Sequence, residues 1–547
     1  MQQRKVQVNS LYLLLPIADN EGPAGSAQRM QTLSIYANDC LSQEIELCLS
    51  AAPRCWSPLY LANYQQMELT VCLEGGDETL IDLIECSDEM KDADALYCKD
   101  AKPIMHITPL RGFMNDPNGL LYFNGRYHFF AQLNPYGFSA GNTCWMHAVS
   151  TDLMHWQELA YALLPDESGL MYSGSGAVDH YNASGLGIDE NPPIFLFYTA
   201  AGSKTRWSQG RAFEIGAAVS LDGGMHFCKL SQNPLVGHIA FMNRDPKVVY
   251  CPEENAWVMA LYLDNSRYQL LFSGNLLDWR KTQIIEIPGS AECPDLFCLP
   301  LDGDKSKMKW VLWGSTDNYL IGHLKEGVFT QEGPVVKGPS RQKVSAHSDL
   351  MCSAGSYAAQ TYFGLPEGRV VQQAWVQTIT KKVPFVSCAS IPNELNLIST
   401  PDGPRLSILP VKEVDCVTDS KFSIRNRGLE DLCRIPREAF SECMDITITL
   451  RYLQDHPLAL SVRGILIVYD PRRDMLLLPN GMFHLKTKHG ELGLRILTDR
   501  CSLELYTLDG LFNTTVATVL DPAKTEVRVI SMDIPVGADI EIRKIIP

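Results

Sequence analysis

The sequence predicts an all-β protein: a small N-terminal β module, a five-bladed β-propeller and a C-terminal β-sandwich. Two observations support this. Helical periodicity is weak along the whole chain, whereas short apolar stretches alternate with clusters of turn residues. A segment with the pattern serine, polar turn, aromatic residue also recurs at intervals of about 50 to 70 residues, which is typical of four-stranded propeller blades.

With 547 residues, the chain is too long for one core, so two or three domains are expected. Residues 1–98 are predicted to form the N-terminal β module, and a polar, acidic connector at 85–94 leads from it toward the next domain. Nothing in this stretch indicates a function. Strands are expected at 6–17, 32–36, 45–49 and 67–73.

Residues 103–385 are predicted to form the propeller. The repeated segment starts at Ser150, Ser220 and Ser273 and reaches an aromatic residue six or seven positions later. About 280 residues at this period correspond to roughly five blades. A single sandwich would be large at this length, and a parallel α/β fold would need helices between its strands, which the pattern does not predict.

Residues 395–547 lack the repeat and are predicted to form an antiparallel sandwich. The segment 465–469 is apolar on both faces, which predicts a buried central strand. Strands are expected at 446–453, 458–468, 492–498 and 502–508.

Composition excludes several classes of partner. A net charge of −16 disfavours nucleic acids and anionic membranes, and no apolar run approaches the ~20 residues that span a bilayer. The 17 cysteines form no metal-like pattern and are expected to be free thiols in a reducing compartment. A cytoplasmic location is therefore expected, and export with the signal missing is the alternative. Residues 11–18 are interpreted as a strand and not as a signal peptide.

A hairpin is predicted around Asp116. Residues 115–119 have the composition of a turn, and the strands 120–123 and 126–130 flank the pair Asn124-Gly125. Such a hairpin would hold the Asp116 carboxylate on a rigid support that is open to a ligand. Taken alone, this segment could equally be an ordinary turn.

Two further acidic residues, Asp245 and Glu292, lie in distinctive local sequences. Arg244 precedes Asp245 at the start of an apolar stretch, and small or apolar residues flank Glu292. In a propeller, residues far apart in sequence meet at the central channel, and glycoside hydrolysis needs two carboxyl groups around the scissile bond. A third acid could hold the sugar. The apolar and small neighbours of Glu292 favour a proton donor. Asp245 could instead form a structural ion pair with Arg244, and Cys293 is expected to be a buried thiol.

Three motifs occur in order: Met114-Asn115-Asp116-Pro117-Asn118-Gly119, Arg244-Asp245-Pro246 and Glu292-Cys293-Pro294-Asp295. Together they resemble glycoside hydrolase family 32, the group of invertases, levanases and inulinases. The resemblance covers about 105–547, and its later segments are most similar to the exo-acting levanase and inulinase branch. Residues 1–98 resemble, more faintly, the extra domain that precedes some bacterial levanases.

The resemblance implies a five-bladed propeller followed by a sandwich, and a retaining mechanism on β-fructofuranosides without metal or organic cofactor. Asp116 would be the nucleophile, Glu292 the acid/base and Asp245 the transition-state stabiliser. The carboxyl groups of Asp116 and Glu292 would then lie about 5–5.5 Å apart. Candidate substrate-binding residues are Asn115, Gln132, Trp145, Ser173, Arg244 and Trp375. The two tryptophans would be aromatic walls of the pocket, and a place in the core is the alternative for each.

The sequence departs from the family pattern at Phe113, Ala140 and Met146, where Trp, Trp and Gly are usual. We expect an exo-β-fructosidase that releases fructose from levan- or inulin-type fructans and from sucrose. The preference among these substrates stays open, and so do exo or endo action and the oligomeric state. A fructosyltransferase with the same residues is one alternative, and a non-catalytic fructan-binding protein is another.

Overall fold

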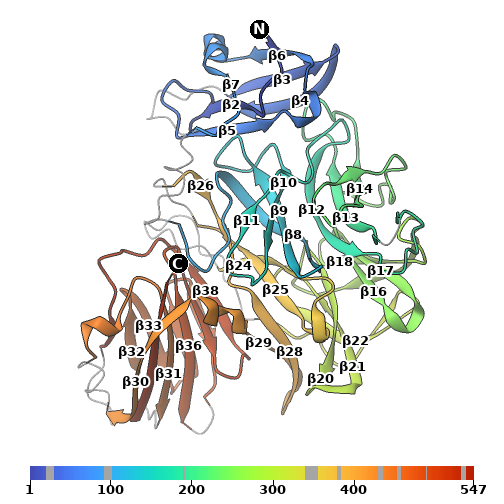
Figure 1. Cartoon of the computed structure of the whole chain (residues 1–547). Helices are drawn as coiled ribbons and strands as arrows, with labels where there is room; N and C mark the ends of the chain where they lie inside the picture. Colours follow the sequence, from blue (N-terminus) through green and yellow to red (C-terminus); the bar gives the residue numbers. More distant parts are fainter. Residues whose placement is uncertain are drawn as a thin grey trace.

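The computed structural model describes residues 1–19, 30–91, 102–188, 191–338, 355–378, 383–428, 435–451, 457–487, 490–530 and 537–546. Within these residues the regular structure consists of β-strands and six short 3-10 helices. The strands form eight sheets: an N-terminal pair, a central group of four and a C-terminal pair (Figure 1). The all-β prediction is therefore confirmed. Among the described residues, no helix is long and apolar enough to cross a membrane.

The N-terminal module consists of two antiparallel sheets that share one apolar core, to which Leu33 and Val71 contribute from one sheet and Leu13 from the other. The stretch 6–17 is not one strand as predicted, because it is divided between the two sheets. The first sheet has the order β1 (Gln2–Gln7), β6 (Glu68–Glu74), β3 (Gln31–Ala37), β4 (Cys40–Leu47). The second has the order β5 (Cys55–Tyr60), β2 (Tyr12–Ile17), β7 (Glu85–Ser87). The 3-10 helices η1 (Ala62–Tyr64) and η2 (Glu78–Leu83) lie in the connections.

The first three central sheets have a similar build, with consecutive antiparallel strands. The first has the order β11 (Gln157–Glu158), β10 (Cys144–Ser150), β9 (Arg126–Asn134), β8 (Gly112–Phe123), β26 (Phe385–Val386). The second contains β12 (Leu170–Val178), β13 (Ile194–Ala201), β14 (Phe213–Ser220) and β15 (Cys228–Lys229). The third contains β16 (Arg244–Cys251), β17 (Ala256–Asp264), β18 (Arg267–Ser273) and β19 (Arg280–Glu286), with η3 (Pro252–Glu254) between its first two strands.

The fourth central sheet has two halves, joined where β20 pairs in parallel with β28 at Leu301 and Leu397. One half contains β23 (Val328–Gln331), β22 (Tyr319–Lys325), β21 (Asp304–Trp313) and β20 (Asp295–Leu301). The other contains β28 (Asn393–Thr400), β25 (Val371–Val376), β24 (Ser356–Thr361), β27 (Cys388–Ala389) and β29 (Gly403–Pro410), with η4 (Pro366–Gly368). The strands β8, β12, β16, β20 and β24 contact one another in succession, and β24 contacts β8.

The hairpin predicted around residues 124–125 is confirmed. It joins β8 to β9, and both Asn124 (φ 47°) and Gly125 (φ 79°) have left-handed backbone conformations. Two consecutive positive φ angles are the requirement of a type I′ turn, which explains the Asn-Gly pair.

The repeated segment forms the same turn in three sheets. Ser150, Ser220 and Ser273 each end the third strand of their sheet in chain order. In the first copy, the Ser150 hydroxyl accepts a hydrogen bond from the Leu153 N–H (2.9 Å), and the Asp152 carboxylate accepts one from the His155 N–H (2.8 Å). The other two copies contain equivalent bonds. The repeat seen in the sequence is therefore a recurring structural unit.

The C-terminal sheets enclose one core, to which Ile446 and Leu494 contribute from one sheet and Leu460 from the other. Residues 465–469 form a central strand as predicted, but Leu466 is 47% exposed, because this sheet packs against its partner on one face only. The first sheet has the order β30 (Thr418–Gly428), β40 (Gly537–Ile545), β31 (Met444–Arg451), β36 (Glu491–Thr498), β37 (Ser502–Thr507), β38 (Asn513–Ala517). The second sheet has the order β35 (Gly481–His484), β34 (Met475–Leu478), β33 (Ile465–Asp470), β32 (Leu458–Val462), β39 (Val527–Val529). Two 3-10 helices, η5 (Lys412–Val417) and η6 (Arg437–Ala439), lie in the connections.

His106 joins the central sheets to the C-terminal sheets. Its buried imidazole contacts Asp499 through Nδ1 (2.8 Å) and Glu504 through Nε2 (3.0 Å). Burial opposes a charge on the ring, but the hydrogen bonds to these carboxylates raise the pKa of His106 well above its usual value. The N–H groups of Ile104 and Met105 also donate to Asp499 (3.0 and 2.7 Å). A buried ion cluster therefore fixes the junction between the two groups of sheets.

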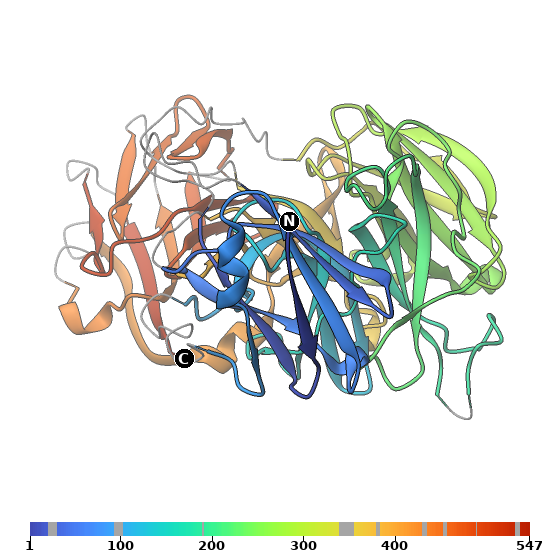
Figure 2. The ribbon, with the colours of Figure 1, turned by 90° about the horizontal axis from the view of Figure 1, so that it is seen from above.

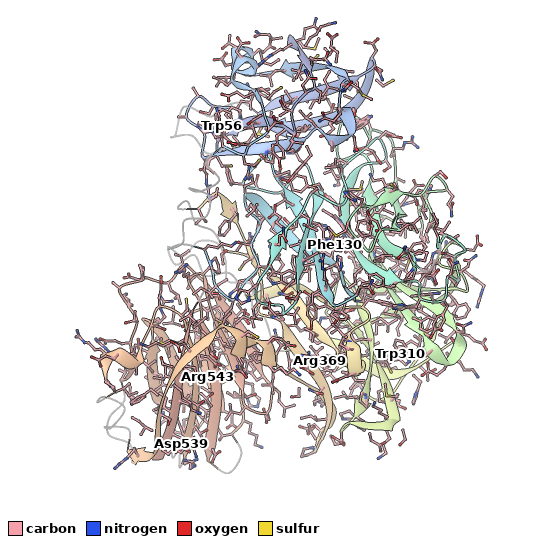
Figure 3. The ribbon with its side chains drawn as sticks, in the orientation of Figure 1. Trp56, Phe130, Trp310, Arg369, Asp539 and Arg543 are labelled. Carbon is pink, nitrogen blue, oxygen red and sulfur yellow. The ribbon has the colours of Figure 1, made fainter. Side chains whose placement is uncertain are left out.

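The N-terminal module rests on the loop 135–143, which joins β9 to β10. Tyr136 from this loop is 5% exposed and packs in the core of the module. The Asn142 amide exchanges two hydrogen bonds with the backbone of Glu46 (2.8 and 2.6 Å). Trp56, at the lower edge of the module in Figure 3, accepts a hydrogen bond from Arg111 through its carbonyl (2.5 Å). Seen from above, the module lies between the C-terminal sheets and the second and third central sheets (Figure 2).

Candidate active site

Asp116 lies near the start of β8, where a β-bulge interrupts the pairing of this strand with β9. A bulge redirects a side chain out of the regular alternation. Asn118 fixes the segment, because its amide donates to the Asp116 carbonyl (3.1 Å) and its amide oxygen accepts from the Gly174 N–H (3.1 Å). The Ser173 hydroxyl donates to the Asp116 carboxylate at 2.8 Å. The carboxylate is therefore held between β8 and β12.

Gln132 and Ser173, two of the predicted sugar-binding residues, are connected to this carboxylate. The Gln132 amide donates to the Ser173 hydroxyl (2.8 Å), which in turn donates a hydrogen bond to the Asp116 carboxylate. Both side chains are buried, whereas Asn115, beside Asp116 in the bulge, is half-buried. The structure brings these residues together, and their contact with a sugar stays a prediction.

Asp245 lies at the start of β16 and is 3% exposed. Its N–H donates to the Thr199 hydroxyl (2.9 Å), and its carboxylate accepts a hydrogen bond from the Cys293 N–H (3.0 Å). Its φ angle of 62° is left-handed, a conformation that costs a non-glycine residue about 1–2 kcal/mol. Such strain persists where the surroundings fix the backbone, and it is concentrated at functional sites.

Glu292 precedes β20 and also has a left-handed backbone (φ 54°). Both oxygens of its carboxylate accept hydrogen bonds, one from Arg244 (2.5 Å) and one from the Tyr357 hydroxyl (2.5 Å). The side chain is 37% exposed, so the carboxylate faces solvent while its orientation is fixed.

Cys293 connects the three acids. Its sulfur lies 3.5 Å from an Asp116 carboxylate oxygen and 3.6 Å from one of Asp245. Burial raises the pKa of this thiol well above its usual value, so the group is a neutral donor and not a nucleophile. With Arg244 bonded to Glu292 and 3.6 Å from Asp245, the three predicted carboxylates meet in one site.

Burial also controls the protonation of the acids. It raises the pKa of Asp116 to about 6, with the Ser173 hydrogen bond acting in the opposite direction and the nearby Glu292 charge adding to the rise. Burial raises the pKa of Asp245 to about 7, against the effect of Arg244. For both Asp116 and Asp245, burial is therefore the largest effect on the pKa, and it favours the neutral carboxyl group.

The two predicted aromatic walls differ in their surroundings. Trp145 has no exposed surface; it packs with Phe130 and Leu196, and its N–H donates to the Tyr172 carbonyl (3.2 Å). Its ring therefore belongs to the core and does not face a sugar, which corrects the prediction. Trp375 is half-buried and its N–H donates to the Met114 carbonyl (2.8 Å), two residues before Asp116.

Tyr357 was not identified from the sequence. It lies 65 residues after Glu292, and a lone tyrosine carries no local signal. Thr199 was missed for the same reason, although it is the partner of the Asp245 backbone. Within the described part of the chain, no group of three or more histidine, cysteine or acidic side chains is arranged to hold a metal ion. The site therefore offers carboxyl groups with hydroxyl and guanidinium partners, a set suited to general acid and nucleophilic chemistry.

Residues 106–410 match the family model described as "Glycosyl hydrolases family 32 N-terminal domain". The chain belongs to glycoside hydrolase family 32. Among curated family members, it is 33% identical over 353 residues to a levanase of Bacillus subtilis (strain 168), a match that covers 60% of this chain and 50% of the levanase. It is 36% identical over 250 residues to an invertase of Schizosaccharomyces pombe, covering 41% of this chain and 42% of the invertase. The chain thus spans about half the length of these relatives.

Solved structures of family members share the fold. Exo-inulinase from Aspergillus awamori superposes with a TM-score of 0.69 at 23% identity, covering 81% of this chain and 98% of the inulinase. A β-fructofuranosidase from Schwanniomyces occidentalis, complexed with fructosyl-erythritol, gives 0.69 at 23% identity over 82% of this chain and 98% of its own. The central and C-terminal sheets therefore have the architecture of this family.

Proposed function

We propose that this protein is a retaining exo-β-fructofuranosidase that releases fructose from levan- or inulin-type fructans and from sucrose. The observation that supports it most is the meeting of Asp116, Asp245 and Glu292 around Cys293. The names of the relatives, a levanase, an exo-inulinase and an invertase, agree with a β-fructoside as substrate.

In the first step, the Asp116 carboxylate attacks the anomeric carbon of the terminal fructose and forms a fructosyl-enzyme. Ser173 stabilises the ionised form of this carboxylate through its hydrogen bond. The bond from the anomeric carbon to the leaving oxygen breaks at the same time, so that oxygen needs a proton.

Glu292 supplies this proton and, in the second step, takes one from a water molecule. The oxygen of this water bonds to the anomeric carbon, the bond between that carbon and Asp116 breaks, and free fructose leaves. Its carboxyl is the most exposed of the three acids, as a group that must meet both leaving group and water requires. Arg244 and Tyr357 hold it in place from both sides. Asp245, bonded to the Cys293 N–H, holds fructose hydroxyls and stabilises the oxocarbenium-like transition state.

We further propose that the central sheets are the five blades of a propeller. Support comes from the ring of contacts among β8, β12, β16, β20 and β24, the first strand of each unit. The nine-stranded sheet then contains the last two blades. The sequence predicted the limits 1–98, 103–385 and 395–547. We keep the first range and propose 103–410 and 411–547 in place of the other two, because β28 and β29 pair within the central group and the C-terminal sheets begin at β30. Residue 98 lies outside the described residues.

The test is to incubate the protein with sucrose, levan and inulin and to separate the products. Free fructose as the main early product is expected, and a ladder of oligosaccharides from the fructans would contradict exo action. Asp116→Asn and Glu292→Ala should each lower the rate by a factor of about 10² or more. Undiminished fructose release by either variant would refute the assignment. Retention also requires a separation of about 5–5.5 Å between the carboxyl groups of Asp116 and Glu292.

A further inference from the structure

Phe241 is an exposed aromatic residue in the loop that leads to the catalytic arginine and aspartate. Its side chain is 71% exposed, and its φ angle of 40° is left-handed. Isolated exposed apolar residues are common and need no explanation. A bulky residue with positive φ is a genuine outlier, however, and such strain is concentrated at ligand-binding sites.

The loop around Phe241 is rigidly built. Asn243 is fully buried, its amide oxygen accepts hydrogen bonds from the N–H groups of Ile239 (2.8 Å) and Ala240 (3.3 Å), and its own N–H donates to the Ala240 carbonyl (2.9 Å). Met242 packs against the small apolar cluster of Leu170, Ala201 and Phe213. The exposed ring is therefore presented by a fixed turn and not by a loose loop.

Arg244 connects the turn that contains Phe241 to Glu292. One nitrogen of its guanidinium donates to the Met242 carbonyl (2.8 Å), and another donates to Glu292 (2.5 Å). The acid that protonates the leaving oxygen must lie beside the sugar that departs with that oxygen. Phe241 immediately precedes Met242, so its exposed ring belongs to the turn whose carbonyl binds the guanidinium that holds Glu292.

We propose that Phe241 is the platform on which the sugar joined to the cleaved fructose stacks. This rests on the proposed function. The weakly polar C–H face of a pyranose or furanose ring packs against an aromatic ring. Aromatic side chains supply much of the apolar contact area in ligand pockets, while a few polar groups fix the orientation of the ligand. In the second step, an acceptor sugar would occupy the same place as the departing one. The platform therefore also favours transfer of fructose to sugar over transfer to water.

The proposal is tested with Phe241→Ala, Phe241→Gly and Phe241→Trp, with sucrose and a short inulin-type oligosaccharide as substrates. Removing contacts that are equal in ground state and transition state raises KM and leaves kcat unchanged. We expect KM to rise about tenfold in the Ala and Gly variants, with kcat within about twofold and KM near the wild-type value in the Trp variant. At high sucrose, the ratio of transfer products to free fructose should fall in the Ala and Gly variants.

Two controls separate this role from a structural one. Fructose as a competitive inhibitor occupies only the subsite at Asp116, so its inhibition constant should not change. The Gly variant accepts the positive φ without strain, so it should keep or exceed the wild-type Tm. Tyr181→Ala is the matched surface control: Tyr181 is 69% exposed, lies beyond the far end of β12 and contacts Tyr250 (ring centroids 5.5 Å), and its loss should change no kinetic constant.

If the wild type is active and the Ala and Gly variants both have its KM, the platform is overturned and the hydrolase assignment stays in place. Equal rises in KM for the oligosaccharide and in the inhibition constant of fructose would also overturn it, because the effect would then lie at the fructose subsite. A wild type that releases no fructose from any substrate would overturn the proposed function itself.

Discussion

Replacing His106 by alanine tests the buried ion cluster at the junction between the central and C-terminal sheets. The variant removes an imidazolium and leaves Asp499 (0% exposed) and Glu504 (1% exposed) buried without their shared cation. Removing one partner of a buried ion pair costs about 3–5 kcal/mol.

We expect the cost to lie at the lower end, about 3 kcal/mol, because each carboxylate keeps other donors. Asp499 retains the N–H groups of Ile104 and Met105 (3.0 and 2.7 Å). Glu504 retains the N–H of Ile391 (3.1 Å). These bonds stabilise part of the buried negative charge, but they supply no positive charge of their own.

The assay is urea unfolding of wild type and variant, followed by tryptophan fluorescence at several pH values. Since the folded pKa of His106 is raised above its unfolded value of about 6.5, its stabilising effect is complete below that pH and is lost as the pH rises through the folded pKa. The difference in unfolding free energy should therefore be largest near pH 6 and shrink in alkaline solution.

The control is His155→Ala, which removes another His–Asp pair. His155 contacts Asp152 at 2.7 Å, but its side chain is 60% exposed, so the loss should be below about 1 kcal/mol. A cost for His106→Ala that is equally small, or one that does not change between pH 6 and pH 10, would refute the reasoning.

Three further outcomes are expected. The value of kcat/KM should fall about tenfold per pH unit below about 6, because Asp116, with its pKa raised to about 6, must be ionised to attack; a flat acid limb in a pH–rate profile would contradict this. Gly174→Ala should lower the free energy of unfolding in urea by about 3 kcal/mol and abolish activity, because the alanine Cβ would lie 1.8 Å from the Phe197 carbonyl oxygen. A variant as stable as the wild type would show that β12 and β13 can move apart there at no cost. Asn142→Ala should lower Tm by a few degrees through the loss of two hydrogen bonds to Glu46, and an unchanged thermal scan would mean that the module is held by its other contacts alone.

Features of the fold that depend on local chemistry were predictable from the sequence. The Asn124-Gly125 hairpin follows from the two positive φ angles that its turn requires. The recurring serine turn could be recognised because the hydroxyl of Ser150 and the carboxylate of Asp152 bond to N–H groups only two or three residues away. The central carboxylates were found because each carries a distinctive set of neighbours in the sequence.

Contacts between distant segments were not predictable. Tyr357 reaches Glu292 from another strand, and no property of its neighbours distinguishes it from other tyrosines. The role of Trp145 was predicted wrongly, because all seven residues of β10 are buried and the strand therefore lacks the alternation that would reveal which face an indole occupies. The break between β1 and β2 was missed because only Asn9 and Ser10 separate the alternating Val6 and Val8 from the apolar run that continues into β2.

Because the N-terminal module packs on the loop 135–143, the two parts cannot be separated without exposing apolar side chains. A chain that starts at residue 103 would leave Tyr136 and Phe138 in water, although both pack in the core of the module and Arg54 lies 3.9 Å over the Phe138 ring. The same cut would free the strand ends that carry Gln132. The N-terminal module thus covers apolar side chains of this loop, and a chain that starts at residue 103 should aggregate more readily than the full chain.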